Sequence, residues 1–168
     1  VLATAIKADW EGSAAHEEEV FHWASRLNRF PGEAVATFGL RAATDVTGFG
    51  LGGHLLEMAT ASKCTVRLEV ANVPLMRNAL ELAGVGLLPA GSHANKHFCD
   101  RTVLVSPGID PVLVDLMFDA QTSGGMVLGV PGLRVEEVRA WLLERGEMAV
   151  VIGSVETPRE DGKRLVLC

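Results

Sequence analysis

The feature that most constrains this chain is a glycine-rich stretch at residues 43–58, between a strand-like run and a helical pattern. The preceding residues, 41–46, favour a strand, and beyond the glycines apolar residues recur at helical spacing. A glycine-rich turn between a strand and a helix exposes backbone N–H groups at the positive end of the helix dipole. The stretch therefore predicts a phosphate-binding turn. Its four glycines fall within six positions, Gly48, Gly50, Gly52 and Gly53.

Asp45, at the end of the predicted strand, modifies this interpretation. A carboxylate repels a phosphate unless a cation lies between them. Magnesium binds carboxylate and phosphate oxygens together. We therefore interpret Asp45 as a magnesium ligand that faces the phosphates of a nucleotide. The alternative is an Asp that caps the following helix, and the residue pattern alone does not decide between the two.

A dinucleotide site is a second alternative. Gly48, Gly50 and Gly53 satisfy the G-x-G-x-x-G spacing. Glu69 follows about twenty residues later, at the end of another strand-like run, as such a site requires. Against this, the site favours apolar residues before the first glycine, whereas this chain has Thr-Asp-Val-Thr at 44–47. The carboxylate would oppose a pyrophosphate bound without metal, so the motif alone leaves the ligand open.

Three motifs, in this order along the chain, carry a resemblance to a known family. The first is Thr-Asp-Val-Thr-Gly-Phe-Gly at 44–50, followed by Gly-His-Leu at 53–55. The second is Gly-Leu-Leu-Pro-Ala-Gly-Ser-His-Ala-Asn at 86–95, and the third is Asp-Ala-Gln-Thr-Ser-Gly-Gly at 119–125. Together they resemble the selenophosphate synthetases (selenide, water dikinases), which belong to the superfamily of aminoimidazole ribonucleotide synthetase. Ala120 stands where the family usually has proline.

The resemblance implies roles for particular residues. Asp45 would be the one magnesium-binding carboxylate that this domain supplies, and the others would lie in a preceding domain. No catalytic residue is expected in this chain, because the family's cysteine or selenocysteine and its nearby lysine lie near the N-terminus of the full protein. The residues expected to bind the nucleotide, through backbone N–H groups and polar side chains, are Thr47, Gly48, Gly50, Asn95, Thr122 and Ser123.

Several of these positions also have a structural interpretation. Thr122 and Ser123 could equally belong to a turn that packs under the central glycine stretch. We expect His54 to be a half-buried packing residue and Glu57 to be a solvated or helix-tying side chain. Residues 84–95 resemble a long loop that is mobile without nucleotide, and long loops of this kind are more often functional than idle.

The order of the predicted elements indicates an α+β domain. Strands and helices alternate irregularly, and adjacent strands occur near the end, which favours a mixed β-sheet covered by helices over a uniform doubly wound sheet. The resemblance implies the same fold, that of the C-terminal domain of the aminoimidazole ribonucleotide synthetase-like superfamily. The expected strands are 1–6, 41–46, 65–70, 101–105, 126–130, 149–152 and 164–167, and the expected helices are 17–28, 31–39, 51–62, 76–83, 111–117 and 135–145.

Length and composition suit one domain, 1–168, of a larger enzyme. A chain of 168 residues that is 48% hydrophobic can bury a sizeable core. It opens without Met in an apparent strand, and the resemblance implies an N-terminal ATP-binding domain ahead of it. We therefore expect this chain to fold by itself but to be inactive, and the full-length enzyme to be a homodimer.

The net charge and the cysteines limit the classes of partner and the compartment that we expect for this protein. The net charge of −6 argues against nucleic-acid binding, which requires a basic surface. No apolar run approaches the roughly 18 residues of a membrane helix. Cys64, Cys99 and Cys168 share no metal-binding spacing, and we interpret them as reduced thiols of a cytoplasmic protein. We expect Cys64 to be buried packing and Cys99 to lie in a loop, and neither they nor the terminal Cys168 to act as nucleophile.

The expected activity of the full enzyme follows from the resemblance. It would use ATP, Mg²⁺, selenide and water to form selenophosphate, AMP and phosphate. The alternatives are another ATP-dependent synthetase or kinase of the same superfamily, such as thiamine-monophosphate kinase, and a non-catalytic nucleotide-binding or interaction module. Metal dependence separates them, because a dinucleotide module should bind NAD without metal and an interaction module should bind neither.

Overall fold

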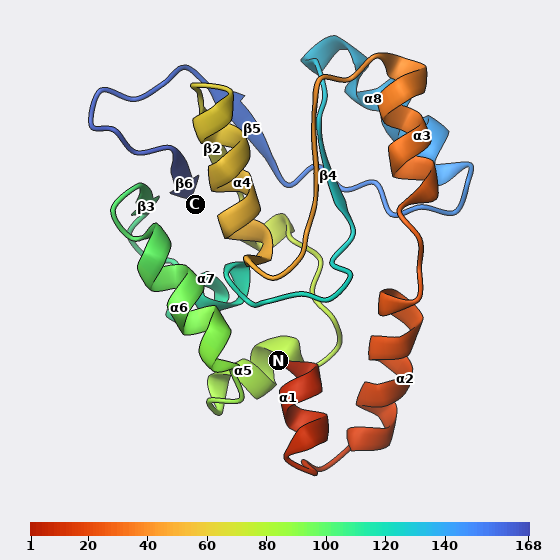
Figure 1. The fold of residues 1–168 in the computed structure, drawn as a ribbon, viewed down its shortest axis with the longest axis vertical. Coiled ribbons are helices and arrows are strands. Elements are labelled where there is room, and N and C mark those ends of the chain that lie inside the picture. Colours follow the sequence, from red (N-terminus) through yellow and green to blue (C-terminus); the bar gives the residue numbers. More distant parts are fainter.

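The computed structural model describes the backbone of residues 1–168 and every side chain except that of Ser13. The strands and helices are shown in Figure 1. The strands are β1 (Ala42–Asp45), β2 (Thr65–Leu68), β3 (Val103–Val105), β4 (Met126–Gly129), β5 (Gly153–Glu156) and β6 (Leu165–Leu167). The α-helices are α1 (Leu2–Lys7), α2 (Ser13–Ala24), α3 (Arg29–Phe38), α4 (Gly50–Ala61), α5 (Ala79–Gly84), α6 (Ala90–Cys99), α7 (Pro111–Met117) and α8 (Val135–Leu143).

Four strands form a mixed sheet in the order β3-β6-β2-β5. β6 pairs in parallel with both β3 and β2, while β5 runs antiparallel to β2. Leu68 of β2 and Leu165 and Leu167 of β6 are fully buried. Helix α4 packs against β2 and β6 (Figure 1). Burial of each such leucine stabilises the fold by roughly 1.5–3 kcal/mol, so this sheet and α4 form the centre of the main core.

β1 and β4 form a separate antiparallel ribbon, in which Ala42 lies opposite Gly129 and Asp45 lies opposite Met126. Helices α3 and α8 pack beside this ribbon (Figure 1). The Asp45 end of the ribbon leads into α4, so the ribbon places the glycine stretch at the edge of the main core. The buried side chains of this second, smaller core are Ala34, Phe38, Leu40, Val138 and Leu142.

The predicted fold class is confirmed, because the domain is α+β with a mixed sheet and covering helices. Local signals placed several elements well. At the start of α7, for example, the Asp110 carboxylate accepts a hydrogen bond from the Val112 N–H at 2.9 Å, and Pro111 is the first helical residue. Within the described residues, none of the helices is both long and apolar enough to cross a bilayer.

The predicted strand at residues 1–6 is wrong, because Leu2–Lys7 forms α1. The buried positions are Val1, Leu2 and Ala5. That spacing belongs to a helix and not to the alternation of a strand. Helix α1 packs against α2 and α5. A segment this short has weak local preferences, so its tertiary partners decide its conformation.

The strand predicted at 149–152 is also wrong, because the strand lies at Gly153–Glu156. Val150 and Val151 are 48% and 47% exposed, so the apolar run that suggested a strand remains at the surface. A Cβ at Gly153 would collide with the backbone of Arg67. The missing side chain therefore lets β5 approach and pair with β2, and hydrophobicity alone could not reveal this.

Candidate functional site

The first and third sequence motifs form one structure. The Val46 N–H donates to the carbonyl of Gly125 at 2.9 Å, and the Val46 carbonyl accepts from the Gly124 N–H at 2.9 Å. The carbonyl of Thr47 accepts from the Gln121 N–H at 3.1 Å. The pairing of β1 with β4 thus continues beyond both strands and joins the two glycine turns, 45–50 and 119–125, along one edge.

Glycines permit this close approach. A Cβ on Gly124 would lie 2.9 Å from the side chain and from the carbonyl oxygen of Val46. Gly50 has φ +70°, and a Cβ there would lie 2.7 Å from the backbone of Phe118. Both glycines are therefore needed for chain packing. Gly48 differs, because it is exposed and has nothing within 4 Å of its Cβ position, which leaves it accessible to a ligand.

Asp45 is exposed at the end of β1. Among the described residues its carboxylate has no hydrogen-bond or ion-pair partner, although its backbone carbonyl accepts from the Thr44 hydroxyl at 3.1 Å. The N-cap of α4 is Phe49, and no side chain caps that helix. The alternative of Asp45 as a helix cap is therefore wrong, and its carboxylate is available to a ligand.

A single carboxylate does not make a complete metal site. Across the side chains that the structure describes, no group of three or more His, Cys, Asp or Glu residues gathers in a metal-binding arrangement. Magnesium at phosphate-transfer sites takes one or two carboxylates and completes its shell with phosphate oxygens and waters. The donor set at Asp45 fits a cation that is shared with a bound nucleotide.

The dinucleotide interpretation does not fit the fold. A G-x-G-x-x-G site needs a glycine turn between the first strand and the helix of a parallel βαβ unit. Here the strand before the glycines, β1, belongs to a two-stranded antiparallel ribbon. The next strand, β2, precedes Glu69 and lies in the other sheet. The two strands that would bind such a ligand are therefore not neighbours.

The prediction of a long loop at 84–95 is wrong for residues 90–95, because α6 begins at Ala90. Asn95 lies on this helix, and its side-chain amide donates to the carbonyls of Gly48 at 2.8 Å and Phe118 at 3.2 Å. Asn95 therefore ties the first glycine turn to the end of α7. The sequence did not indicate this helix for two reasons. The buried residues of α6 are only Ser92 and Cys99, so no apolar helical pattern is visible, and Pro89 and Gly91 are residues typical of loops.

Removing the Asn95 amide provides a test of this tie. We expect Asn95→Ala to lower the free energy of unfolding by about 1–2 kcal/mol, because two carbonyls lose their donor. His93 is exposed on the same helix, and His93→Ala should change stability by less than about 0.5 kcal/mol. Urea denaturation of both variants measures the difference, and equal effects would show that the amide does not hold the turn.

Asp119, within the third motif, is a buried structural residue that the sequence did not single out. Its Oδ1 accepts from the Ser92 hydroxyl at 2.8 Å. Its Oδ2 accepts from the Val1 nitrogen and from the Gln121 amide, each at 3.0 Å. A buried carboxylate requires such partners. This network joins the second and third motifs to Val1, the N-cap of α1. It therefore holds the start of the second glycine turn in place.

The second turn presents two hydroxyls to solvent. Thr122 and Ser123 are both exposed. The packing of this turn under the first is carried by its backbone, through Gly124 and Gln121. The two hydroxyls are thus accessible to a ligand. The backbone of the same turn packs under the first glycine turn, as in the alternative interpretation of Thr122 and Ser123.

His54 is more than a packing residue. It is 9% exposed, its Nε2 lies 3.0 Å from the Thr47 hydroxyl, and its Nδ1 lies 3.0 Å from Oε2 of Glu57. The ring of Phe49 meets it edge-on, with centroids 5.9 Å apart. The burial of His54 and the bond of Glu57 within α4 agree with the predictions, but the hydrogen-bonded chain from these two side chains to Thr47 was not predicted.

The cysteines lack the surroundings of a nucleophile. Cys99 is buried at the end of α6, and not in a loop as predicted. Burial raises the pKa of its thiol, and burial followed by the charge of Glu69 raises the pKa of Cys168. A reactive cysteine needs a lowered pKa. Cys64 is half-buried, with its thiol 3.8 Å from the Ala59 carbonyl, which suits packing.

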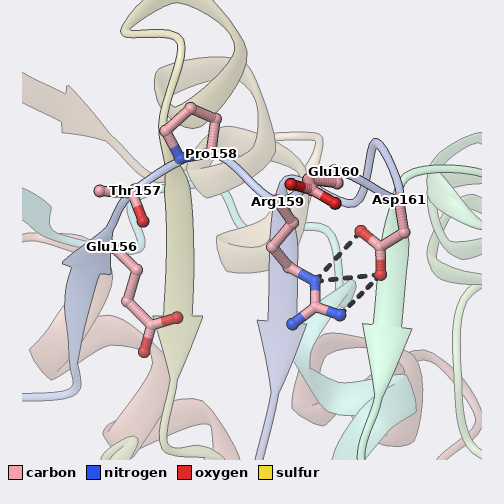
Figure 2. A pocket seen from close by; sticks show the side chains of 6 residues that line it. All are labelled: Glu156, Thr157, Pro158, Arg159, Glu160 and Asp161. Atoms are coloured by element: carbon pink, nitrogen blue, oxygen red, sulfur yellow. Dashed lines mark hydrogen bonds and ion pairs between the residues drawn. The ribbon is translucent and has the colours of Figure 1, made fainter.

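Two hollows of the surface lie away from the glycine turns. One is lined by the turn at residues 156–161, where the Arg159 guanidinium binds the Asp161 carboxylate at 2.6 Å (Figure 2). Another lies between α3 and α8 beside Trp141. The first is an open turn whose arginine is already paired, and the predicted site residues line neither hollow. Along the joined glycine turns, Asp45, Gly48, Thr122 and Ser123 are exposed.

Comparison with known proteins gives consistent matches. The family model described as AIR synthase related protein, C-terminal domain, matches residues 5–164. The chain is 54% identical over 99% of its length to the selenide, water dikinase of Nitratidesulfovibrio vulgaris (strain DSM 19637 / Miyazaki F). It is 37% identical over 92% of its length to the selenide, water dikinase of Clostridioides difficile (strain 630). It spans 48% and 44% of those proteins, about half their length.

A solved structure supports the fold. The crystal structure of hydrogenase maturation protein HypE in complex with ATP matches with a TM-score of 0.52 and 24% sequence identity. The match covers 84% of this chain and 36% of the HypE chain. At this identity the likeness concerns the arrangement of the elements, which agrees with the α+β fold described above.

Proposed function

This chain belongs to the family of AIR synthase related proteins, whose C-terminal domain matches residues 5–164, and we propose that it is the C-terminal domain of a selenide, water dikinase. The observation that carries the proposal is the 54% identity to such an enzyme over 99% of this chain. The physical arrangement supports it, because the turns that carry the first and third motifs lie side by side.

In this proposal the full-length enzyme converts ATP, selenide and water into selenophosphate, AMP and phosphate. An N-terminal ATP-binding domain would precede this one, which accords with a chain about half as long as its relatives. The ATP bound by the HypE neighbour supports the choice of nucleotide. We also propose that the full-length enzyme is a homodimer, as the family resemblance implies.

Magnesium would neutralise the phosphate charges during transfer. In this domain Asp45 would hold it, because its exposed carboxylate is unpaired within the described structure. Gly48, Thr122 and Ser123 would face the phosphates, because all are exposed along the joined turns. Their backbone N–H groups and hydroxyls can donate hydrogen bonds to phosphate oxygens.

Two other predicted site residues would act indirectly. The N–H of Gly50 donates to the Thr47 carbonyl at 3.0 Å, so Gly50 shapes the turn and does not donate to phosphate. The Asn95 amide already donates to two carbonyls, so the group it could still offer is an acceptor oxygen. An acceptor oxygen repels phosphate, and we therefore assign Asn95 to holding the turn.

The proposal is tested with the full-length protein, ATP, Mg²⁺ and selenide. Phosphorus NMR should detect selenophosphate together with AMP, and the 168-residue chain alone should form neither. Omitting selenide should abolish the selenium–phosphorus signal. Phosphorylation of another acceptor without that signal would favour a different synthetase or kinase, and absence of ATP binding would favour an interaction module.

A further inference from the structure

Thr47 lies at the junction of the two glycine turns and is held from several sides. Its backbone carbonyl accepts from the N–H groups of Gly50 at 3.0 Å and Gln121 at 3.1 Å. Its hydroxyl oxygen lies 3.0 Å from Nε2 of His54. With the backbone fixed by two hydrogen bonds and the side chain by a third, the orientation of this hydroxyl is determined by its surroundings.

Glu57 determines which way the hydroxyl proton points. Its Oε2 lies 3.0 Å from Nδ1 of His54. An ionised carboxylate can only accept a hydrogen bond, so Nδ1 carries the imidazole proton. In a neutral imidazole the other nitrogen, Nε2, is then an acceptor. In this neutral, Nδ1-protonated form of His54, the Thr47 hydroxyl donates its single proton to Nε2 and presents only lone pairs on its open side.

Asp45 and Thr47 flank a buried residue, Val46. Val46, between them, is 4% exposed, and both of its backbone polar atoms are bonded to the second turn. The two backbone bonds of Val46 extend the pairing of β1 by one residue, and alternation across Val46 would direct the side chains of Asp45 and Thr47 to the side opposite its own. A carboxylate and the lone pairs of a hydroxyl then face one region. This combination attracts a hard cation and repels phosphate oxygens.

We propose that His54 and Glu57 are positioning residues that make the Thr47 hydroxyl an acceptor for the hydrated cation at Asp45. Thr47 then serves the metal and not the phosphates, which reverses the role expected for its hydroxyl from the sequence. The inference rests on the proposed function, because that function requires a cation at Asp45. It adds a proton chain, Glu57–His54–Thr47, that determines what the hydroxyl can bind.

The proton chain can be measured without nucleotide or turnover. In full-length protein labelled with ¹⁵N-histidine, NMR distinguishes a protonated from an unprotonated ring nitrogen, and the His54→Gln variant identifies the His54 signals. We expect Nδ1 to be protonated and Nε2 to be free, and Glu57→Ala to reduce the population of this tautomer. A proton on Nε2 of His54 in the unaltered protein, alone or together with one on Nδ1, would overturn the proposal.

The role of the hydroxyl is tested with Mn²⁺ as the probe and a non-hydrolysable ATP analogue. We expect Thr47→Val to weaken Mn²⁺ binding about 10-fold or more, by analogy with groups that support metal ligands. Thr47→Ser should restore it, and His54→Gln, which retains an acceptor, should weaken it less than His54→Leu. Binding of the analogue in EDTA should be the same for Thr47→Val and the unaltered protein.

The outcomes separate this inference from the function on which it rests. Unaltered Mn²⁺ binding in Thr47→Val would overturn the inference alone. An equal loss of analogue affinity with and without metal would also overturn it, because the hydroxyl would then be a phosphate donor. An unaltered protein that binds neither Mn²⁺ nor the analogue would overturn the proposed function as well.

Discussion

Asp45→Asn in the full-length protein is expected to reduce selenophosphate formation at least about 100-fold, because even residues that only support metal ligands typically cost 10–100-fold. The substitution is nearly isosteric and removes the charge that would hold the cation between the domain and the phosphates. Asp45 is exposed and its carboxylate makes no bond within the described structure, so the fold should be unaffected. Steady-state turnover at saturating and limiting Mg²⁺ measures the effect, with thermal unfolding as the check on folding.

A matched control makes the same chemical change away from the site. Asp9 is exposed in the turn after α1, so Asp9→Asn removes one negative charge without touching the glycine turns. Its turnover should stay within about twofold of the unaltered protein, since distant surface charges interact weakly at physiological salt. If Asp45→Asn keeps its activity at limiting Mg²⁺, the carboxylate is not a metal ligand.

Gly50→Ala should destabilise the chain by about 2–5 kcal/mol, through the combined costs of a left-handed backbone and of overpacking. Gly50 has φ +70°, and the added Cβ would lie 2.7 Å from the carbonyl carbon of Phe118 and 2.8 Å from the carbonyl oxygen of Asp119. Both contacts are with backbone, which cannot move aside as a flexible side chain would. Urea denaturation of the 168-residue chain measures the loss.

Substitutions at two other glycines distinguish the cost of backbone strain from the cost of overpacking. Gly39 has φ +61° and nothing within 4 Å of its Cβ position, so Gly39→Ala should cost only the backbone strain, about 1–2 kcal/mol. Gly48 has an open Cβ position and no positive φ, and Gly48→Ala should stay within about 0.5 kcal/mol. If Gly50→Ala cost no more than Gly39→Ala, the contact between α4 and the end of α7 would be looser than described.

The candidate site was predictable where its parts are local. The glycine stretch predicted a strand followed directly by a helix, and the structure has β1 and α4 at these positions. The placement of Asp45 at the end of that strand is a matter of counting residues. The partners of His54 were hidden for a different reason. Thr47 and Glu57 lie close in sequence, but an apolar helical pattern shows only that a histidine is buried, and not which polar atoms it meets.

Asn95 illustrates the opposite case. Its two hydrogen-bond acceptors, Gly48 and Phe118, lie 47 and 23 residues away. Nothing near Asn95 in the sequence indicates that these carbonyls come together, so an asparagine in a glycine-containing stretch resembled a ligand-binding loop residue. The structure adds that its amide holds the turn through both carbonyls.

The sequence by itself determined the family motifs, the α+β class, the helix at 111–117 and the glycine turn with its carboxylate. These depend on residues within a few positions of one another, where capping bonds, hydrophobic period and glycine conformations act. Only the tertiary structure decided that residues 1–6 and 90–99 are helical and that the two glycine turns join at Val46. Short segments have weak preferences, so burial against distant neighbours selects their conformation. The backbone bonds between the turns form only after both cores have brought the strands together.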